Sequence, residues 1–112
     1  MSQNFQISNS DTCIRAVIWN DYYVDWEVMT AAYDFHFSIP ACDNQLFVEN
    51  MACIVNNPQS GPAELIDNKT KSEVVVTFDN HYAEFLDGER NFKITTPIRY
   101  IKALLDFIKI EF

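Results

Sequence analysis

Residues 19–49 read WNDYYVDWEVMTAAYDFHFSIPACDNQLFVE, and this stretch decides how the rest of the chain is interpreted. It contains six acidic side chains, both tryptophans and three of the five tyrosines, but no lysine or arginine. Aromatic rings favour apolar contact, whereas carboxylates favour water or a cation. We therefore expect part of this stretch to form a docking surface for a basic partner.

Residues 22–38 fit two kinds of secondary structure. The aromatic and methionine side chains at positions 22, 26, 29, 33 and 37 follow helical spacing. The same segment also alternates as a strand does, with Val24, Trp26 and Val28 against Asp25 and Glu27. Its many aromatic and β-branched residues favour two strands, broken near residues 30–32.

The strand interpretation gathers acidic groups on one surface. In that arrangement Asp25 and Glu27 share the exposed face of the first strand. Asp34, His36 and Ser38 share the exposed face of the second strand. A helix would instead spread the acids around its circumference, so the docking hypothesis depends on the two strands.

The remaining segments predict an α+β fold. Strands are expected at residues 12–19, 72–79, 81–86 and 91–95. An apolar stripe predicts a helix at residues 43–56, with Asp43 as its N-cap. Thr96 and Pro97 suit the N-cap and first position of a second helix, at about 97–110. We expect an antiparallel sheet of about four to six strands packed against both helices.

The length of 112 residues and the 48% apolar composition predict a single domain, residues 1–112, with a real core. Residues 1–11 are polar and are expected to form a loose N-terminal arm. Residues 57–72 contain prolines and glycine and are expected to form a loop, with a possible short turn at 63–66. No internal repeat is visible in the sequence.

The net charge of −8 is distributed unevenly along the chain. Residues 1–68 hold nine acidic residues and one arginine, whereas residues 69–112 hold seven acidic and seven basic residues. The whole imbalance therefore lies in the first part. The negative electrostatic field that this imbalance creates repels nucleic acid and anionic membranes and attracts cationic partners. An acidic composition can also serve solubility alone.

Catalytic and metal-binding motifs are absent from the sequence. The three cysteines, Cys13, Cys42 and Cys53, form no close pair, and we expect Cys13 and Cys53 to be buried reduced thiols. We expect no metal and no cofactor. His36 and His81 could act as general bases beside Asp34 or Asp79, but a structural or surface role is the commoner one for a histidine.

No apolar run approaches the roughly 20 residues needed to cross a bilayer. The first residues show neither a basic segment nor an apolar segment of the secretory kind. We therefore expect a cytoplasmic protein that binds neither membranes nor nucleic acid. The candidate partner-binding residues are Asp21, Tyr22, Tyr23, Asp25, Trp26, Glu27, Asp34, Asp43 and Glu49.

A small, acidic, single-domain protein of this composition resembles the bacterial immunity proteins that neutralise polymorphic toxins, including those of contact-dependent growth inhibition. The acidic and aromatic stretch 19–49 is similar in character to the toxin-facing surfaces of nuclease inhibitors such as barstar. The resemblance implies a partner with a basic nucleic-acid-binding cleft, in which these carboxylates take the place of phosphates. Tyr22, Tyr23 and Trp26 would then be the contact anchors.

Two other functions remain open. One is a phage-type nucleic-acid mimic of the anti-CRISPR kind, whose carboxylates would bind by the same charge complementarity to a larger nucleic-acid-binding complex. The other is a small enzyme that uses His36 or His81 with a carboxylate; a deep pocket with an imidazole hydrogen-bonded to a carboxylate would favour it.

Overall fold

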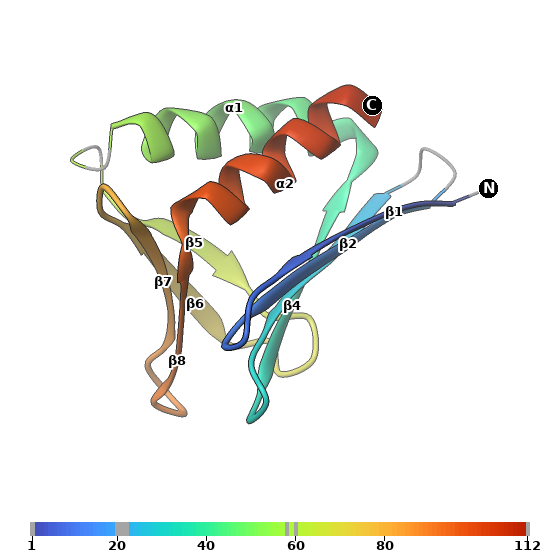
Figure 1. Ribbon diagram of the computed structural model, residues 1–112. Helices are drawn as coiled ribbons and strands as arrows, with labels where there is room; N and C mark the ends of the chain where they lie inside the picture. The colour runs from blue at the N-terminus through green and yellow to red at the C-terminus, as the bar shows by residue number, and fades with distance from the viewer. Residues whose placement is uncertain (1, 20–22, 58, 60, 112) are drawn as a thin grey trace.

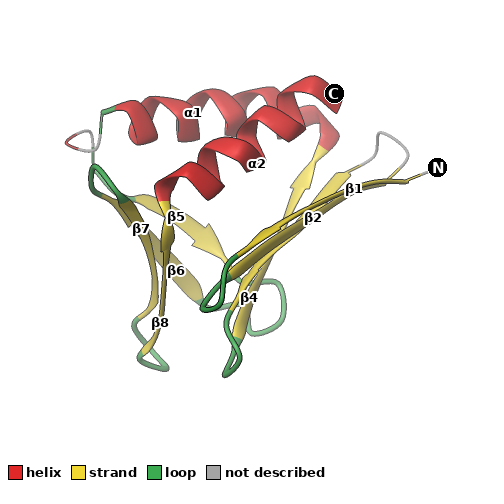
Figure 2. Cartoon of the chain, in the orientation of Figure 1, coloured by secondary structure: helices red, strands yellow, loops and turns green. Residues whose placement is uncertain are grey.

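The computed structural model describes residues 2–19, 23–57, 59 and 61–111. The chain runs through four strands and a helix, and then repeats that order (Figures 1 and 2). The first set is β1 (Ser2–Ser8), β2 (Cys13–Trp19), β3 (Tyr23–Met29), β4 (Asp34–Pro40), the short 3-10 helix η1 (Ala41–Asp43) and α1 (Asn44–Asn56). The second set is β5 (Ala63–Ile66), β6 (Glu73–Phe78), β7 (Tyr82–Asp87), β8 (Phe92–Pro97) and α2 (Ile98–Glu111).

Each set of strands forms its own antiparallel sheet, which we call sheet A (β1–β4) and sheet B (β5–β8). Within each sheet the strands lie in sequence order. Figure 1 shows the sheets on two sides of the molecule, with both helices across the same end. Helix α2 contacts strands of both sheets, while α1 packs on α2 and β4. The core lies between the two sheets and beneath the helices.

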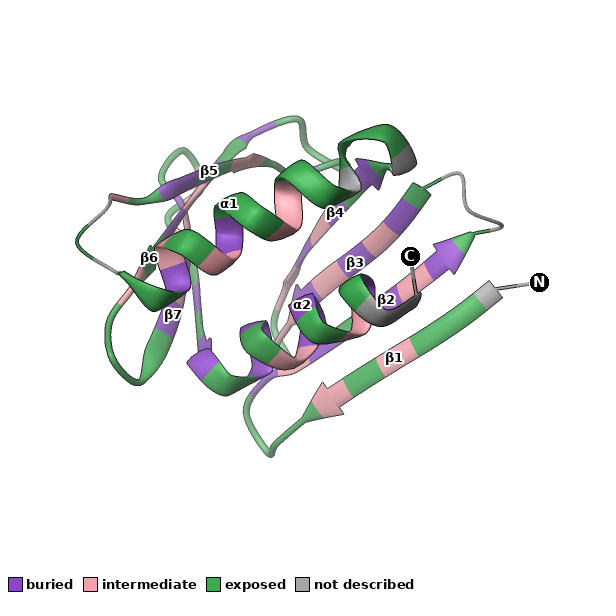
Figure 3. Ribbon diagram, turned by 90° about the horizontal axis from the view of Figure 1, so that it is seen from above, coloured by how far each residue is buried: buried purple, intermediate pink, exposed green. Residues whose placement is uncertain are grey.

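Alternating side chains build this core. Along β2, β3 and β4 every second residue is buried, as the banding in Figure 3 shows. Trp26 of β3 is only 2% exposed, and its ring lies 4.5 Å from Phe37 and 6.1 Å from both Phe47 and Phe85, between ring centroids. Because these rings come from sheet A, helix α1 and sheet B, one aromatic cluster joins the two halves of the chain.

A buried ion cluster joins the halves a second time. Asp67 and Asp87 are both fully buried, and Arg90 lies 3.2 Å from the first through Nη2 and 2.7 Å from the second through Nε. Asp67 also accepts a hydrogen bond from the backbone amide of His36 in β4. The Asn68 amide donates to the His36 carbonyl at 2.8 Å, so this loop is bonded along the outer edge of sheet A.

The α+β class and the two helices are confirmed. Residues 22–38 hold two strands separated at residues 30–33, so the strand interpretation is also confirmed. The described strands number eight in two sheets, whereas about four to six in a single sheet were expected.

Two segments expected to be irregular contain strands instead. Residues 2–8 do not form a loose arm but pair with β2 along their whole length, and the Phe5 ring stacks on Phe107 of α2 with centroids 5.2 Å apart. The expected loop 57–72 contains β5, in which Ala63 is buried and Leu65 is partly buried. Each segment is held both by backbone pairing with its neighbouring strand and by two alternate apolar side chains that pack against the core.

The predicted caps are only partly confirmed. Asp43 occupies the N-cap position of α1, as expected, but its side chain makes no capping hydrogen bond. The hydroxyl of Thr96 is buried and lies 3.2 Å from the Thr12 hydroxyl, and Pro97 is the last residue of β8. The first amide of α2, at Ile98, donates to the backbone carbonyl of His81 at 2.8 Å. A neighbouring turn therefore takes the role assigned to Thr96.

Candidate functional site

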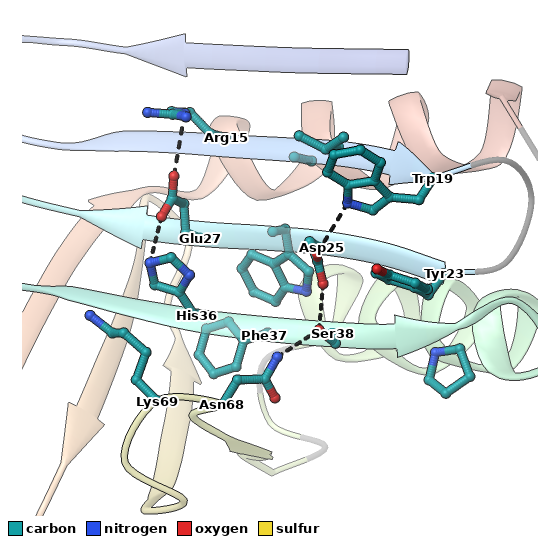
Figure 4. Close-up of a pocket in the computed structure, with 14 residues that line it drawn as sticks. Arg15, Trp19, Tyr23, Asp25, Glu27, His36, Phe37, Ser38, Asn68 and Lys69 are labelled. Atoms are coloured by element: carbon teal, nitrogen blue, oxygen red, sulfur yellow. Dashed lines mark hydrogen bonds and ion pairs between the residues drawn. The ribbon is translucent and has the colours of Figure 1, made fainter. Parts of the chain in front are cut away.

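The outer face of sheet A, turned away from the core, is hollowed by a groove of about 740 Å³ (Figure 4). Strand pairing sets its rows of side chains, because residues directly opposite each other on antiparallel strands point to the same face. Trp19 of β2 lies opposite Tyr23 of β3. The next rows along the groove are Val17, Asp25 and Ser38, and then Arg15, Glu27 and His36.

At one end of the groove a carboxylate lies among aromatic rings. Trp19 and Tyr23 are 41% and 42% exposed. The indole Nε1–H of Trp19 donates to Oδ2 of Asp25 at 3.1 Å, and the Ser38 hydroxyl donates to Oδ1 (Figure 4). Asn68 in turn donates to Ser38 Oγ at 2.6 Å. The Asp25 carboxylate is thus oriented by neutral donors.

At the other end the acids are paired with cations. Glu27 lies 3.3 Å from Arg15 Nε and 2.7 Å from His36 Nε2. The same His36 nitrogen lies 2.9 Å from Asp34, which also forms an ion pair with Lys69. Burial alone would raise the pKa of Asp34, but hydrogen bonds from Lys69 and His36, together with their charges, hold this pKa below its ordinary value. This end of the groove is a closed network of opposite charges.

The Glu27, Asp34 and His36 donor atoms lie within 4.8 Å of one another, a grouping that could hold a metal ion. Carboxylate oxygen and imidazole nitrogen suit several divalent metals. However, Arg15 and Lys69 already offset the two carboxylates, which lowers the attraction for a further cation. The grouping is therefore better described as an ion-pair network than as a metal centre.

The structure separates the predicted binding residues. Tyr23, Asp25, Glu27 and Asp34 all lie on or beside the groove. Trp26 borders the floor of the groove, but its side chain is 2% exposed and belongs to the core on the inner side of β3. Its expected role as an exposed anchor is therefore corrected. Asp21 and Tyr22 lie outside the described residues.

Asp43 and Glu49 lie away from the rows of the groove. Asp43 is exposed and lines an adjoining hollow of about 460 Å³, between α1 and the edges of β4 and β5, which shares Ser38, Pro40 and Asn68 with the groove. Glu49 is exposed on α1, where it accepts a hydrogen bond from Gln45. Leu46, one of the apolar side chains of this helix, is 58% exposed.

Sequence reasoning missed several groove residues. Alternation along residues 12–19 places Arg15 and Trp19 on one face, so their presence beside the acids was accessible from the pattern. Asn68 and Lys69 had no such signal, because they come from a loop about thirty residues away along the chain.

The other candidate groups lie elsewhere. His81 is exposed in the turn before β7, where its backbone amide donates to Asp79. The cysteines are free thiols; Cys13 is partly buried, and burial raises its pKa. Cys53 is exposed on α1, so the expectation that it is buried was wrong.

Comparison of the chain with protein-family models, with curated proteins and with solved structures gave no significant match. None of the described helices combines the length and the apolar character required to cross a membrane. The geometry and charge of the groove are therefore the features from which a function can be inferred.

Proposed function

We propose that this protein is an inhibitor of the immunity-protein type, which neutralises a basic toxin by covering its active site with the outer face of sheet A. The expected toxin is a nuclease, because its cleft must be cationic to hold phosphates. The inhibitor's carboxylates would occupy the positions of those phosphates. No cofactor takes part, and the protein is proposed to act in the cytoplasm.

One observation carries the proposal: two exposed aromatic side chains, Trp19 and Tyr23, stand beside a carboxylate on a hollowed surface. Tyr and Trp are favoured at the centres of protein interfaces, and complementary charge accelerates association. The net charge of −8 extends this attraction beyond the groove.

The test is to express the toxin domain encoded beside this gene and to measure its association with the protein at increasing salt. We expect an association rate that falls as ionic strength rises, because exposed charges are screened. Trp19→Ala combined with Asp25→Lys should slow association and abolish protection of cells from the toxin. The matched control is Glu73→Lys combined with Glu84→Lys, which alters charge on the outer face of sheet B.

Three results would overturn the proposal. The first is a groove variant that binds as the unaltered protein does. The second is equal loss of binding in the control variant, which would show that net charge alone is responsible. The third is a gene with no toxin beside it and a chain that instead binds a nucleic-acid-processing complex, which would support the nucleic-acid mimic.

A small enzyme is the second candidate, favoured by one contact. His36 Nε2 lies within 3 Å of two carboxylates in the groove, as general acid–base chemistry requires. Glu27 and Asp34 are each held by a further cation, however, and both lie against the imidazole nitrogen that a substrate would have to approach. An inhibitor protects in proportion to the amount bound, one to one, whereas an enzyme protects below that ratio. Titration of toxin activity separates the two.

A further inference from the structure

Asp25 differs from the other acids of the groove in its partners. Glu27 and Asp34 each form an ion pair with a lysine or arginine. Within the described part of the chain, Asp25 receives hydrogen bonds from Trp19 and Ser38 alone, and no cationic group lies within 4.0 Å of it. Its negative charge is therefore oriented but not offset.

The Asp25 carboxylate also keeps free acceptor capacity. An ionised carboxylate offers about four lone-pair positions on two oxygens. One position on Oδ2 is used by the Trp19 indole and one on Oδ1 by the Ser38 hydroxyl. Each oxygen can therefore accept one more hydrogen bond, and the two together can receive a two-pronged donor.

The rings beside Asp25 suit the same kind of donor. Trp19 and Tyr23 are cross-strand neighbours on the face that carries Asp25, and about two-fifths of each side chain is exposed to solvent (Figure 4). Aromatic faces attract cations, with tryptophan the strongest of the side chains. A planar cation can stack on a ring while its edge donates to a carboxylate.

We propose that Trp19, Tyr23 and Asp25, together called the Asp25 site, bind the guanidinium group of an arginine side chain of the basic partner. This inference rests on the proposed function and names the group that the groove recognises. Arginine fits better than lysine, because its fixed fork of N–H donors matches two carboxylate oxygens and its flat surface matches the rings.

The protein's own arginine on this face does not fill the site. Arg15 is four residues from Trp19 along β2, a distance of roughly 13 Å at the usual rise per residue. It is held there by Glu27 at 3.3 Å. The site therefore remains available to a side chain from another molecule.

Titration with Nα-acetyl-arginine amide tests the site by NMR of the indole N–H groups of ¹⁵N-labelled protein. The Trp19 indole signal should shift along a saturating curve in the millimolar range, because its N–H donates to the carboxylate that the ligand engages. The Trp26 signal is an internal control, since that side chain is buried on the opposite face of β3 and should not move. Nα-acetyl-citrulline amide, similar in shape but neutral, should produce no saturating shift.

Variants make the result decisive. Asp25→Asn should weaken binding of the arginine probe about tenfold or more, as expected for loss of a charged hydrogen-bond acceptor. Glu73→Gln on sheet B is the matched control and should bind as the unaltered protein does. An unchanged Trp26 signal in each variant verifies that the fold is intact.

The proposal is overturned if the arginine probe fails to shift the Trp19 signal, if Asp25→Asn binds equally well, or if the lysine probe, Nα-acetyl-lysine amide, binds as tightly as arginine. These results are independent of the toxin experiment. A protein that binds its toxin through the groove but ignores the arginine probe would sustain the proposed function and reject the Asp25 site. A protein that binds the arginine probe but no toxin would sustain the Asp25 site and reject the proposed function.

Discussion

The two halves of the chain repeat the order of four strands and a helix but use the outer faces of their sheets differently. On sheet A the outer face is hollowed and carries both the Asp25 site and an ion-pair network. On sheet B the corresponding rows are mixed, for example Thr77 opposite Glu84 and Val75 opposite Leu86. The described ion pair on that face, between Lys93 and Glu84, is long, at 4.0 Å.

The distribution of charge along the sequence differs from its distribution in the folded protein. The first 68 residues carry the whole net charge of −8. In the folded protein Lys69, from the neutral part of the chain, lies against Asp34 of sheet A. The folded groove is therefore less acidic than its own strands suggest, and the charge left for a partner is concentrated near Asp25.

The largest expected effect tests whether the two halves share one core. Phe85 of sheet B is fully buried, with its ring centroid 6.1 Å from that of Trp26 in sheet A. Phe85→Ala should lower the free energy of unfolding by about 3–5 kcal/mol, because it leaves a cavity among packed rings. Urea unfolding followed by both circular dichroism and tryptophan fluorescence should give a single transition.

Tyr82→Ala, on the same strand at a 52% exposed position, is the control and should change stability by less than about 0.5 kcal/mol. Both tryptophans belong to sheet A, so fluorescence reports that half directly. Separate transitions in the two signals would mean that the halves unfold independently.

A smaller loss of stability is expected when the buried ion cluster of Asp67, Asp87 and Arg90 is broken. Arg90→Met leaves the buried carboxylates of Asp67 and Asp87 without their cation. Loss of one partner of a fully buried pair costs about 3–5 kcal/mol, and we expect about 2–3 kcal/mol here because the Arg90 side chain is 31% exposed. Chemical denaturation at neutral pH measures the difference.

Lys93→Met serves as the control for Arg90, since its ion pair with Glu84 lies on the surface and should contribute less than about 1 kcal/mol. Equal losses in the two variants would show that the buried cluster has no special part in joining the sheets.

The pH dependence of stability sharpens the role of Asp87. Burial alone would raise the pKa of Asp87, but hydrogen bonds from the Arg90 side chain and from backbone amides hold this pKa below its ordinary value. The resulting stabilisation is fully present above the unfolded-state pKa of about 3.9 and is lost as the pH falls through the lower folded-state pKa. Asp87→Asn should therefore be less stable near neutral pH, with the difference shrinking in acid.

Unfolding free energies measured from neutral pH down to the acid limit of the fold test this expectation. Asp106→Asn, at an exposed position of α2, is the control and should change the free energy of unfolding at neutral pH by less than about 0.5 kcal/mol. A difference between Asp87→Asn and the unaltered protein that grows as the pH falls would contradict the assignment.

Much of the fold was predictable because local patterns and burial agree in it. Alternation placed Asp25 and Glu27 on the outer face of β3 and Val24 and Val28 on its inner face, as observed. Five Leu and Ile side chains that recur at helical spacing along α2 are all buried: Ile98, Ile101, Leu104, Leu105 and Ile108. The hydrophobic periodicity is strong in these elements because each has one solvent-exposed face and one buried face.

The rest depended on contacts between distant segments. Strand β1 has few apolar residues and is fixed by pairing with β2 and by the contact of Phe5 with Phe107. Lys69 and Asp34 are also far apart in the sequence, so no local residue spacing predicts their contact. Division into two sheets was equally hidden, since the repeated order of elements has no counterpart in a repeated sequence.

The smallest expected effect on stability distinguishes the two faces of sheet A through its tryptophans. Trp19→Phe should lower the free energy of unfolding by about 1 kcal/mol or less, because this side chain is 41% exposed and the substitution keeps an aromatic ring while removing the hydrogen bond to Asp25. The same substitution should remove most of the quenching of tryptophan fluorescence by acrylamide, since the remaining Trp26 is 2% exposed. Trp26→Phe should leave a protein whose fluorescence is quenched readily. Efficient quenching of Trp26 in the Trp19→Phe variant would mean that the inner face is open to solvent, and the assignment of one binding face and one core face to sheet A would then be wrong.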